Sequence, residues 1–255
     1  HIHDRRQRQM CIRDRGNLND DFQKIDMENL DIKQLPELER YMLHRVYELN
    51  NNFKNYFKSY DFHNLYKELL NFCTVDLSSF YFDIRKDALY CDSKDSDRRK
   101  SSIVVLNIIL ESLVKWFAPI LSFTTEEIFT LINKEQKSIH LEQFMKYPES
   151  FQDEELHKKW IELKKIRDIC NISIEAKRAS KEIGSSLEAS LVINLNKKLF
   201  EISKNVDFSE ICITSSALVH QSNTDETIIE TIKAEGNKCP VCWKINKVKC
   251  ERHSD

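Results

Sequence analysis

Glycine and proline are scarce in this sequence, with only 3 glycines and 4 prolines among 255 residues. This scarcity argues against a glycine-rich nucleotide-binding α/β sheet and against an all-β sandwich, because both folds need many turns. Charged residues make up 31% of the chain, a proportion that suits helices with one face in water. The composition therefore predicts a mainly α-helical protein.

The sequence also lacks a strong excess of one charge and any long apolar run. Its formal net charge is -2, so any binding of nucleic acid must come from local basic patches. No apolar run approaches the roughly 18 residues that a membrane span needs, and no signal-peptide pattern is present. The eight cysteines do not form the framework of a secreted disulfide-rich domain. We therefore expect a cytoplasmic protein that does not enter a membrane.

No catalytic constellation stands out in the sequence. The eight histidines are scattered, with no serine or cysteine partner at a telling spacing. The adjacent carboxylates of Glu126 and Glu127 are better explained as charges at a helix N-terminus. We therefore assign no catalytic residue.

Apolar residues recur at helical spacing through most of the first 180 residues. This periodicity predicts helices over 36–60, 61–80, 101–117 and 154–181, and a further helix that begins at Thr124. Thr124 and Glu127 form a capping box, and Phe123 and Ile128 are placed for a hydrophobic staple. Long helices with short connections favour an antiparallel bundle.

The pattern changes after Gly184, where apolar and polar residues alternate as far as Leu195 and predict a strand. A short helix over 197–205 and a second strand over 209–214 would complete a small α+β module. The chain then divides into a tail (1–15), a helical bundle (16–150), a long helix with the α+β module (151–219), a polar linker (220–236) and a C-terminal tail (237–255).

The first 15 residues show no apolar periodicity and stand apart from the rest. Within them, the hexapeptide MCIRDR resembles a translated sequencing adaptor, so we interpret 1–15 as non-native and exclude it from the fold. The alternative is a genuine basic arm.

Four residues near the C-terminus have the spacing of metal ligands. Cys239, Cys242, Cys250 and His253 follow the pattern C-x2-C-x7-C-x2-H. The first pair can form a tight knuckle, the second pair completes four ligands, and Zn²⁺ suits such a set. Four protein ligands close the site, which predicts one structural zinc ion rather than a catalytic one. The alternative is a set of free thiols on a frayed tail.

Cations and one tryptophan surround these four residues. They are Lys238, Trp243, Lys244, Lys247, Lys249 and Arg252. A zinc-held loop of this kind can bind phosphates and stack a base or ribose. We select Trp243, Lys244 and Arg252 as candidate RNA contacts. In the alternative interpretation, Trp243 covers the metal site and the lysines only keep the loop soluble.

The stretch 72–99, FCTVDLSSFYFDIRKDALYCDSKDSDRR, places large aromatic rings beside charges that need partners. It ends in a polar loop with Arg98, Arg99 and Lys100, which we select as further candidate RNA contacts. We expect Lys86 and Asp87 to form a structural ion pair within the bundle.

Several segments resemble bacterial isoleucyl-tRNA synthetases. The runs LSSFYFDIRKDALYCD, RRKSSIVVL and APILSFTTEEIF resemble the anticodon-binding helical domain of that family, and LERYMLHRV resembles the first helix of the domain. RDICNISIEAKRASKEIGSSLEASLVI is similar to the helix and strand that follow, and KCPVCWK to the C-terminal zinc module. The resemblance runs from about Gly16 to His253. Valyl and leucyl synthetases share the helical domain, but IGSSLEA together with Cys-x-x-Cys-Trp favours the isoleucyl family.

The sequence departs from that family in two ways. The ATP-handling signatures of the His-Ile-Gly-His and Lys-Met-Ser-Lys-Ser types are absent, and so is a recognisable editing domain. Because those parts lie upstream in the family, the resemblance implies a truncated chain that neither activates isoleucine nor edits valine. The family's zinc module usually finishes with Cys-x-x-Cys, whereas here His253 follows Cys250. The fourth ligand is then His253 or a residue beyond Asp255, or the site is degenerate.

The resemblance implies a function for the whole chain, as the tRNA-binding C-terminal part of an isoleucyl-tRNA synthetase. The complete enzyme would use ATP to join isoleucine to its tRNA, and this part would bind that tRNA but not ATP. Its other partners would be the missing N-terminal catalytic and editing domains, and we expect a monomer. The alternatives are a free-standing zinc-containing RNA-binding protein, the equivalent part of a valyl- or leucyl-tRNA synthetase, and a structural helical adaptor.

Overall fold

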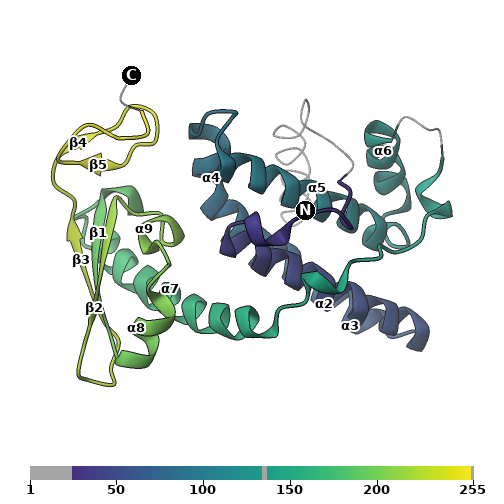
Figure 1. Cartoon of the computed structure of the whole chain (residues 1–255), viewed down its shortest axis with the longest axis horizontal. Coiled ribbons are helices and arrows are strands. Elements are labelled where there is room, and N and C mark those ends of the chain that lie inside the picture. The colour runs from purple at the N-terminus through teal and green to yellow at the C-terminus, as the bar shows by residue number, and fades with distance from the viewer. Residues whose placement is uncertain (1–24, 134–136, 254–255) are drawn as a thin grey trace. The chain divides into compact units, whose positions relative to one another are not determined.

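The computed structural model describes residues 25–133 and 137–253 (Figure 1). The chain divides into two compact units, His1–Glu154 and Glu155–Asp255, here called the helical unit and the mixed unit. The segment 1–15, which the sequence analysis interprets as non-native, lies outside the described residues. None of the described helices is both long enough and apolar enough to cross a membrane.

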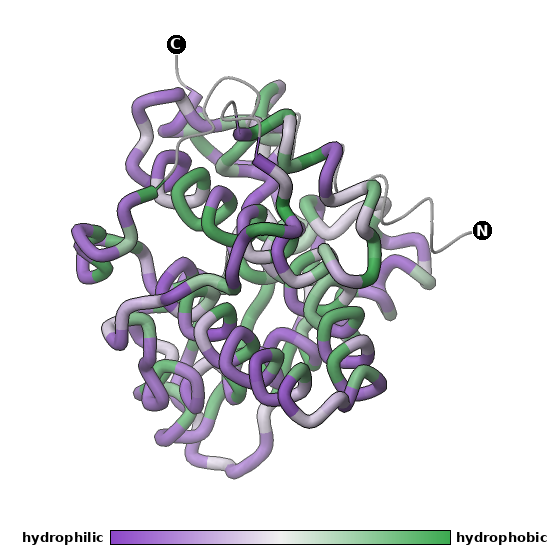
Figure 2. The backbone as a smooth tube through the Cα atoms, turned by 90° about the vertical axis from the view of Figure 1, so that its right-hand side faces the viewer, coloured by the Kyte–Doolittle hydropathy of each residue, from purple (hydrophilic) through white to green (hydrophobic). Residues whose placement is uncertain are grey.

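The helical unit consists of helices joined by short turns. Its helices are α2 (Glu37–Ser59), α3 (Phe62–Asn71), the π-helix η2 (Phe72–Tyr81), α4 (Phe82–Cys91), α5 (Asp97–Phe117) and α6 (Ser122–Ile132), with the 3₁₀ helices η1 (Ile32–Gln34), η3 (Ile139–Leu141) and η4 (Glu149–Phe151). Figure 2 shows hydrophobic and hydrophilic residues alternating along the helices, the pattern that turns one face of each toward a core.

Helix α2 is the centre of this unit, since it packs against both α3 and α5. The ring of Trp116 on α5 lies edge-on to Phe53 of α2, with 5.0 Å between centroids, and near Phe72, at 6.1 Å. The indole Nε1 of Trp116 donates to the side chain of Asn50 at 3.1 Å, and Asn50 in turn donates to the carbonyl of Met145 at 2.9 Å. These contacts fix the segment after α6 against the bundle.

A buried ion pair joins α2 to α4. Arg85 donates to both carboxylate oxygens of Glu39 at 2.6 Å, and the two side chains are almost completely buried. The hydroxyls of Tyr81 and Ser102 donate to the same carboxylate, at 3.3 and 3.2 Å. Burial, followed by the nearby negative charge of Glu39, raises the pKa of Tyr81. The charges next to the aromatic residues of the 72–99 stretch therefore have a structural role here.

The prediction of a mainly helical bundle is confirmed, but some helix ends differ from those expected. The helix expected over 61–80 is α3 followed by a π-helix, and the helical winding continues to Cys91. Helix α6 begins at Ser122 with Leu121 as its N-cap, so Thr124 is not a cap. Phe123 is 93% exposed and forms no staple. The tight turn at Leu121, whose N–H donates to Phe117 at 2.7 Å, starts the helix two residues early.

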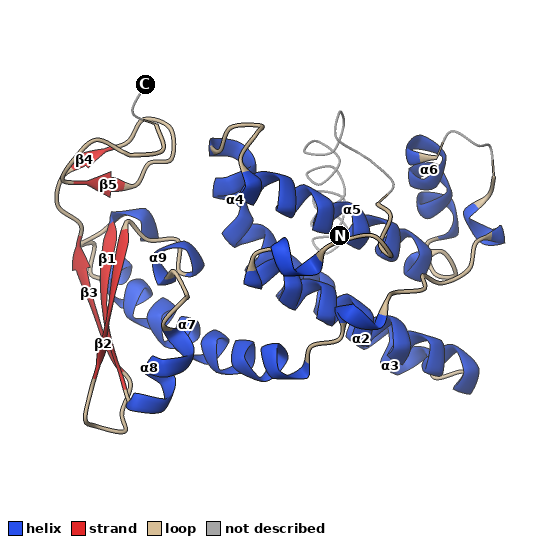
Figure 3. Ribbon diagram, viewed as in Figure 1, coloured by secondary structure: helices blue, strands red, loops and turns tan. Residues whose placement is uncertain are grey.

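The mixed unit combines a long helix with a small sheet. Its elements are α7 (Glu154–Ala179), η5 (Ser186–Glu188), β1 (Ala189–Leu195), α8 (Lys197–Ser203), α9 (Phe208–Ile211), β2 (Ser216–Gln221), β3 (Ile228–Lys233), β4 (Asn237–Lys238) and β5 (Ile245–Asn246). Figure 3 shows that all described strands belong to this unit.

The main sheet has the strand order β2-β1-β3, with β1 parallel to β2 and antiparallel to β3. Alternate residues of β1 are buried, which is the period of a strand with one face in a core. Helix α7 contacts this module through Ser173, whose hydroxyl lies 2.7 Å from that of Thr231 on β3. Arg167 on α7 also donates to the carbonyl of Ile211, at the end of α9, at 2.9 Å.

Two expectations for this unit are wrong. The first half of the strand expected over 209–214 belongs to α9, whose first turn is capped by Asp207, and the strand itself starts at Ser216. The expected linker 220–236 contains the end of β2 and all of β3. Only Thr231 of β3 is buried, and the sequence IIETIK shows no regular apolar alternation, so this edge strand lacks the sequence pattern of a strand.

Candidate metal centre and nucleic-acid interface

The metal-ligand cluster is built on a hairpin. Strands β4 and β5 pair antiparallel, and the chain between them turns so that the Trp243 N–H donates to the Cys239 carbonyl at 3.0 Å. The Cys239 N–H donates to the Lys244 carbonyl at 2.9 Å. Gly236, with φ 132°, precedes β4, and a Cβ there would lie 2.2 Å from the backbone oxygen of Asn246. The hairpin therefore depends on a residue without a side chain at Gly236.

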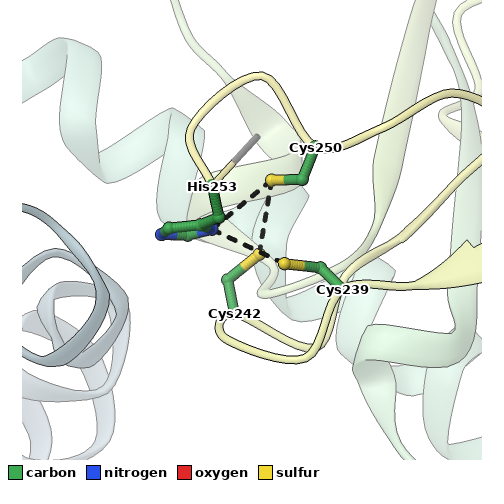
Figure 4. Close-up of side chains that lie close together, drawn as sticks. All are labelled: Cys239, Cys242, Cys250 and His253. Carbon is green, nitrogen blue, oxygen red and sulfur yellow. Dashed lines mark hydrogen bonds between the residues drawn. The ribbon is translucent and has the colours of Figure 1, made fainter. Parts of the chain in front are cut away.

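The four predicted ligands converge at the end of this hairpin, as Figure 4 shows. The Cys242 and Cys250 sulfurs are 3.8 Å apart, and His253 Nδ1 lies 3.6 Å from the Cys239 sulfur and 3.4 Å from that of Cys250. With ordinary Zn–S and Zn–N bond lengths, a tetrahedral zinc site has S···S edges of about 3.8 Å and S···N edges of about 3.6 Å. The side chains therefore have the spacing of a tetrahedral Cys₃His site, and His253 can serve as its fourth ligand.

The surroundings of the two knuckle thiols differ. The backbone N–H of Cys242 donates to the Cys239 sulfur and lowers the pKa of Cys239 to about 6, whereas burial raises the pKa of Cys242 to about 11. A metal ion binds both as thiolates, and its positive charge offsets the cost of burying the second one. The donor set therefore fits a zinc ion better than two independent thiols.

Two serines outside the cluster attach the hairpin to the rest of the mixed unit. The Ile245 N–H donates to the Ser215 hydroxyl oxygen at 2.7 Å, and that hydroxyl donates to the Leu187 carbonyl at 2.5 Å. Lys244 Nζ donates to the Ser209 hydroxyl at 3.3 Å. Neither serine was predictable from the sequence, because they lie 30 and 35 residues from their partners and belong to no local motif.

The candidate RNA contacts of the hairpin have different surroundings. Trp243 is 58% exposed, and Lys238 Nζ lies 5.2 Å from its ring centroid. Trp243 also adopts φ 63°, a conformation unusual for a bulky residue. Lys244 is half-buried against Ser209, and Arg252 is exposed.

The other candidate contacts lie at the corner between α4 and α5. Arg98 pairs with Asp92 at 2.8 Å and with Asp87 at 3.2 Å. Arg99 donates to the Leu89 carbonyl in the last turn of α4, at 2.8 Å. Both arginines therefore join the two helices.

Lys100, by contrast, is 56% exposed. Its ammonium lies 3.3 Å from the carboxylate of Asp95, which is itself 97% exposed. The expected pairing of Lys86 with Asp87 is wrong, because adjacent residues of a helix do not face each other. Lys86 pairs instead with Asp83 at 2.5 Å.

Comparison with protein families gives one match over much of the chain. Residues 39–193 match the family described as the anticodon-binding domain of tRNA ligase. The match includes α2 to α7 and most of β1, so it crosses from the helical unit into the mixed unit.

Comparison with individual proteins gives matches to isoleucine–tRNA ligases. The chain is 97% identical to that of Pelagibacter ubique over 240 residues, which are 94% of this chain and 26% of that protein. It is 38% identical to that of Bartonella quintana over 221 residues, 82% of this chain and 23% of that protein. It is 39% identical to that of Brucella abortus over 228 residues, 85% of this chain and 24% of that protein. The chain thus spans about a quarter of the length of these curated relatives.

Proposed function

We propose that the chain binds the isoleucine tRNA, because it belongs to the tRNA-ligase family with this anticodon-binding domain and is the anticodon-binding part of an isoleucine–tRNA ligase. The match over 39–193 carries this proposal. The helical unit would contact the anticodon stem and loop, where unstacked bases offer their faces for stacking and their edges for hydrogen bonds. The sequence alternative of a valyl or leucyl enzyme has no support in a chain that is 97% identical to an isoleucine–tRNA ligase.

Within the helical unit, the proposal assigns Lys100 to direct contact with RNA phosphates. Its exposure leaves the ammonium group accessible, and its partner Asp95 is itself exposed. Arg98 and Arg99, which hold the α4–α5 corner, would contact the RNA beside Lys100. Phosphate contacts of this kind position the RNA and make its affinity salt-dependent.

Within the mixed unit, the proposal assigns one structural zinc ion to Cys239, Cys242, Cys250 and His253. The ion would fix the fold of the hairpin without taking part in a reaction, because all four positions are filled by protein. The hairpin would then hold Trp243, Lys244 and Arg252 toward the tRNA, with the exposed indole available to stack on a base or ribose.

In the whole enzyme, this part would act together with catalytic and editing domains that use ATP and handle isoleucine. We propose that the chain alone binds neither ATP nor isoleucine and works in the cytoplasm as a monomer. Its contribution is to orient the tRNA, since binding energy far from the reacting atoms can lower the barrier by positioning the acceptor end.

The test is binding of the chain to isoleucine, valine and leucine tRNA transcripts, with zinc present, across a salt series. We expect the isoleucine transcript to bind most tightly and the affinity to fall steeply with salt. Charge reversal of Lys244 and Arg252 should weaken binding and flatten the salt dependence.

Equal binding of all three transcripts would move discrimination between tRNAs to other parts of the enzyme. No binding at any salt concentration would contradict the proposal. The alternative from the sequence, a free-standing RNA-binding protein, has no support in a chain that is 97% identical over 240 residues to part of an isoleucine–tRNA ligase.

A further inference from the structure

Aromatic and lysine residues alternate through the corner between α2 and α3. The sequence from 53 to 62 reads FKNYFKSYDF. Here Tyr60 is 79% exposed and Phe62 52% exposed, so these rings do not belong to the core. A core helix would bury such residues, and their exposure as a group indicates a binding surface.

The rings at this corner form a connected series. The centroids of Tyr60 and Phe62 are 6.2 Å apart, those of Phe62 and Phe57 5.7 Å apart, and those of Phe57 and Phe144 5.1 Å apart. The last contact joins the end of α2 to the segment after η3. The series therefore offers several ring faces and edges along one path.

A cavity of about 570 Å³ opens beside these rings. Phe57 and Phe144 line it together with Ala118 and Pro119. Its charged and titratable lining residues are Lys54, Lys115, Lys146, His140 and Glu142. Its volume lies within the range of about 300–1,000 Å³ typical of small-ligand pockets, which is enough for one nucleotide.

The charges around the cavity favour an anion. Burial lowers the pKa of Lys54, and the nearby positive charges of Lys146 and Lys58 lower it further, so both lysines add to the positive potential at Lys54. The Lys54 ammonium also donates to the carbonyl of Met145 at 3.1 Å, a bond that neutralises no charge. No ion pair within 25–133 and 137–253 involves any of the three lysines.

Other charged side chains at this site already have partners. Lys115 lies 3.2 Å from Glu111 and 3.3 Å from Glu142. The carboxylate of Asp61, within the corner, accepts from the N–H of Asn64 at the start of α3. An incoming phosphate would therefore offset the positive charge that Lys58 and Lys146 place near Lys54, and it would displace no ion pair of these lysines.

We propose that this surface, the aromatic–lysine corner formed by Lys54, Phe57, Lys58, Tyr60, Phe62, Phe144 and Lys146, binds an unpaired nucleotide of single-stranded RNA. The base would enter the cavity beside Phe57 and Phe144 or stack on Phe62, and its phosphates would lie between the lysines. Alternating cations and aromatic rings are the combination that single-stranded nucleic acid requires, because every base has a face to stack and every linkage has a charge. This inference rests on the proposed function and identifies where an unstacked base binds.

The test uses the 255-residue chain with zinc and the isoleucine tRNA transcript. The charge variant is Lys58→Glu with Lys146→Glu, and the stacking variants are Phe62→Ala and Phe62→Trp. The control is Lys33→Glu with Lys198→Glu, which makes the same change in net charge at exposed lysines outside the corner. Circular dichroism checks that each variant is folded.

We expect the charge variant to lose about tenfold or more in affinity and to show a shallower salt dependence. Phe62→Ala should lose about fivefold or more, whereas Phe62→Trp should retain binding, because an indole stacks as well as a phenyl ring. Transcripts with 4-thiouridine at unpaired positions should crosslink to the segment 55–67 on irradiation.

If the wild-type chain binds the tRNA, but the corner variants bind as tightly as the control and no crosslink maps to 55–67, the inference is wrong and the proposed function stands. Such a result would leave the corner to an acidic protein partner. If the wild-type chain binds no tRNA, both proposals fail.

Discussion

The carboxylate of Glu39 is the residue on which the polar core of the helical unit depends. It accepts hydrogen bonds from Arg85, Tyr81 and Ser102 at a site without solvent exposure. Removal of one member of a buried ion pair leaves the other charge without a partner in a medium of low dielectric.

We therefore expect Glu39→Leu to lower the free energy of unfolding by about 3–5 kcal/mol. The double variant Glu39→Leu with Arg85→Met should recover most of this loss, because neither charge then remains buried. Urea unfolding of the two variants measures both effects. A double variant as unstable as the single one would show that packing, and not charge, dominates at this position.

Trp243 combines an exposed indole with a backbone conformation that favours glycine. The left-handed conformation costs a bulky residue about 1–2 kcal/mol, and glycine in its place loses about 0.5–1 kcal/mol of conformational entropy. Trp243→Gly should therefore leave thermal stability unchanged or slightly raised, while the affinity for tRNA falls about tenfold through loss of stacking.

Trp243→Ala is the matched comparison, because it removes the same indole but keeps the backbone strain. We expect it to lose the same affinity and to be less stable than the glycine variant. Unchanged tRNA affinity in both variants would remove Trp243 from the interface.

The role of a single residue was predictable from the sequence where chemistry fixes its spacing from its partners. It was not predictable where the partner lies far away in the chain. Cys239, Cys242, Cys250 and His253 could be selected from the sequence because a tetrahedral metal site constrains their spacing. The partner of Arg85 could not, since Glu39 is 46 residues away and nothing local indicates the pair.

At the level of elements, the β4–β5 hairpin depends on Gly236. A Cβ at this position would lie 2.2 Å from the Asn246 oxygen, which is backbone and has no rotamer by which to move away. We expect Gly236→Ala to destabilise the hairpin by roughly 1–3 kcal/mol or more and to weaken zinc binding, measured by competition with a chromophoric chelator.

Gly184→Ala provides the control for this prediction. A Cβ there would lie 3.4 Å from a carboxylate oxygen of Glu188, an ordinary contact with a flexible side chain. The control should bind zinc as the wild type does. Equal zinc affinity in both alanine variants would show that the hairpin shifts to accept the extra methyl group.

Helices were more predictable from the sequence than strands or irregular helical winding. Helices α2 and α7 are long and strongly periodic, and both were expected nearly to their observed ends. Strand β3 was not expected, because an edge strand with one buried residue has no clear apolar alternation. The π-helix η2 differs from an α-helix in its hydrogen bonds rather than its composition, so residue periodicity does not reveal it.

The division of the whole chain into two units implies two unfolding transitions. The proposed metal centre belongs to the mixed unit alone, and metal binding contributes directly to the stability of the fold that holds it. In scanning calorimetry, a zinc chelator should lower the midpoint of one transition by several degrees and leave the other unchanged.

Cys250→Ser should have the same effect as the chelator without any chelator present. A single transition that shifts as a whole would show that the two units unfold together. Two transitions whose midpoints are both unchanged by the chelator would exclude a structural metal ion.

The order of the strands also has a consequence for synthesis on the ribosome. Strand β1 is central in its sheet, yet both neighbours follow it in the chain, and the second is complete only at Lys233. At about 5–20 residues per second, the roughly 40 residues after Leu195 take about 2–8 s to emerge. During that interval the buried face of β1 and the apolar stripe of α7 lack their final cover. The nascent chain therefore exposes an apolar surface at this stage, and a chaperone that binds apolar segments would protect it until β3 is in place.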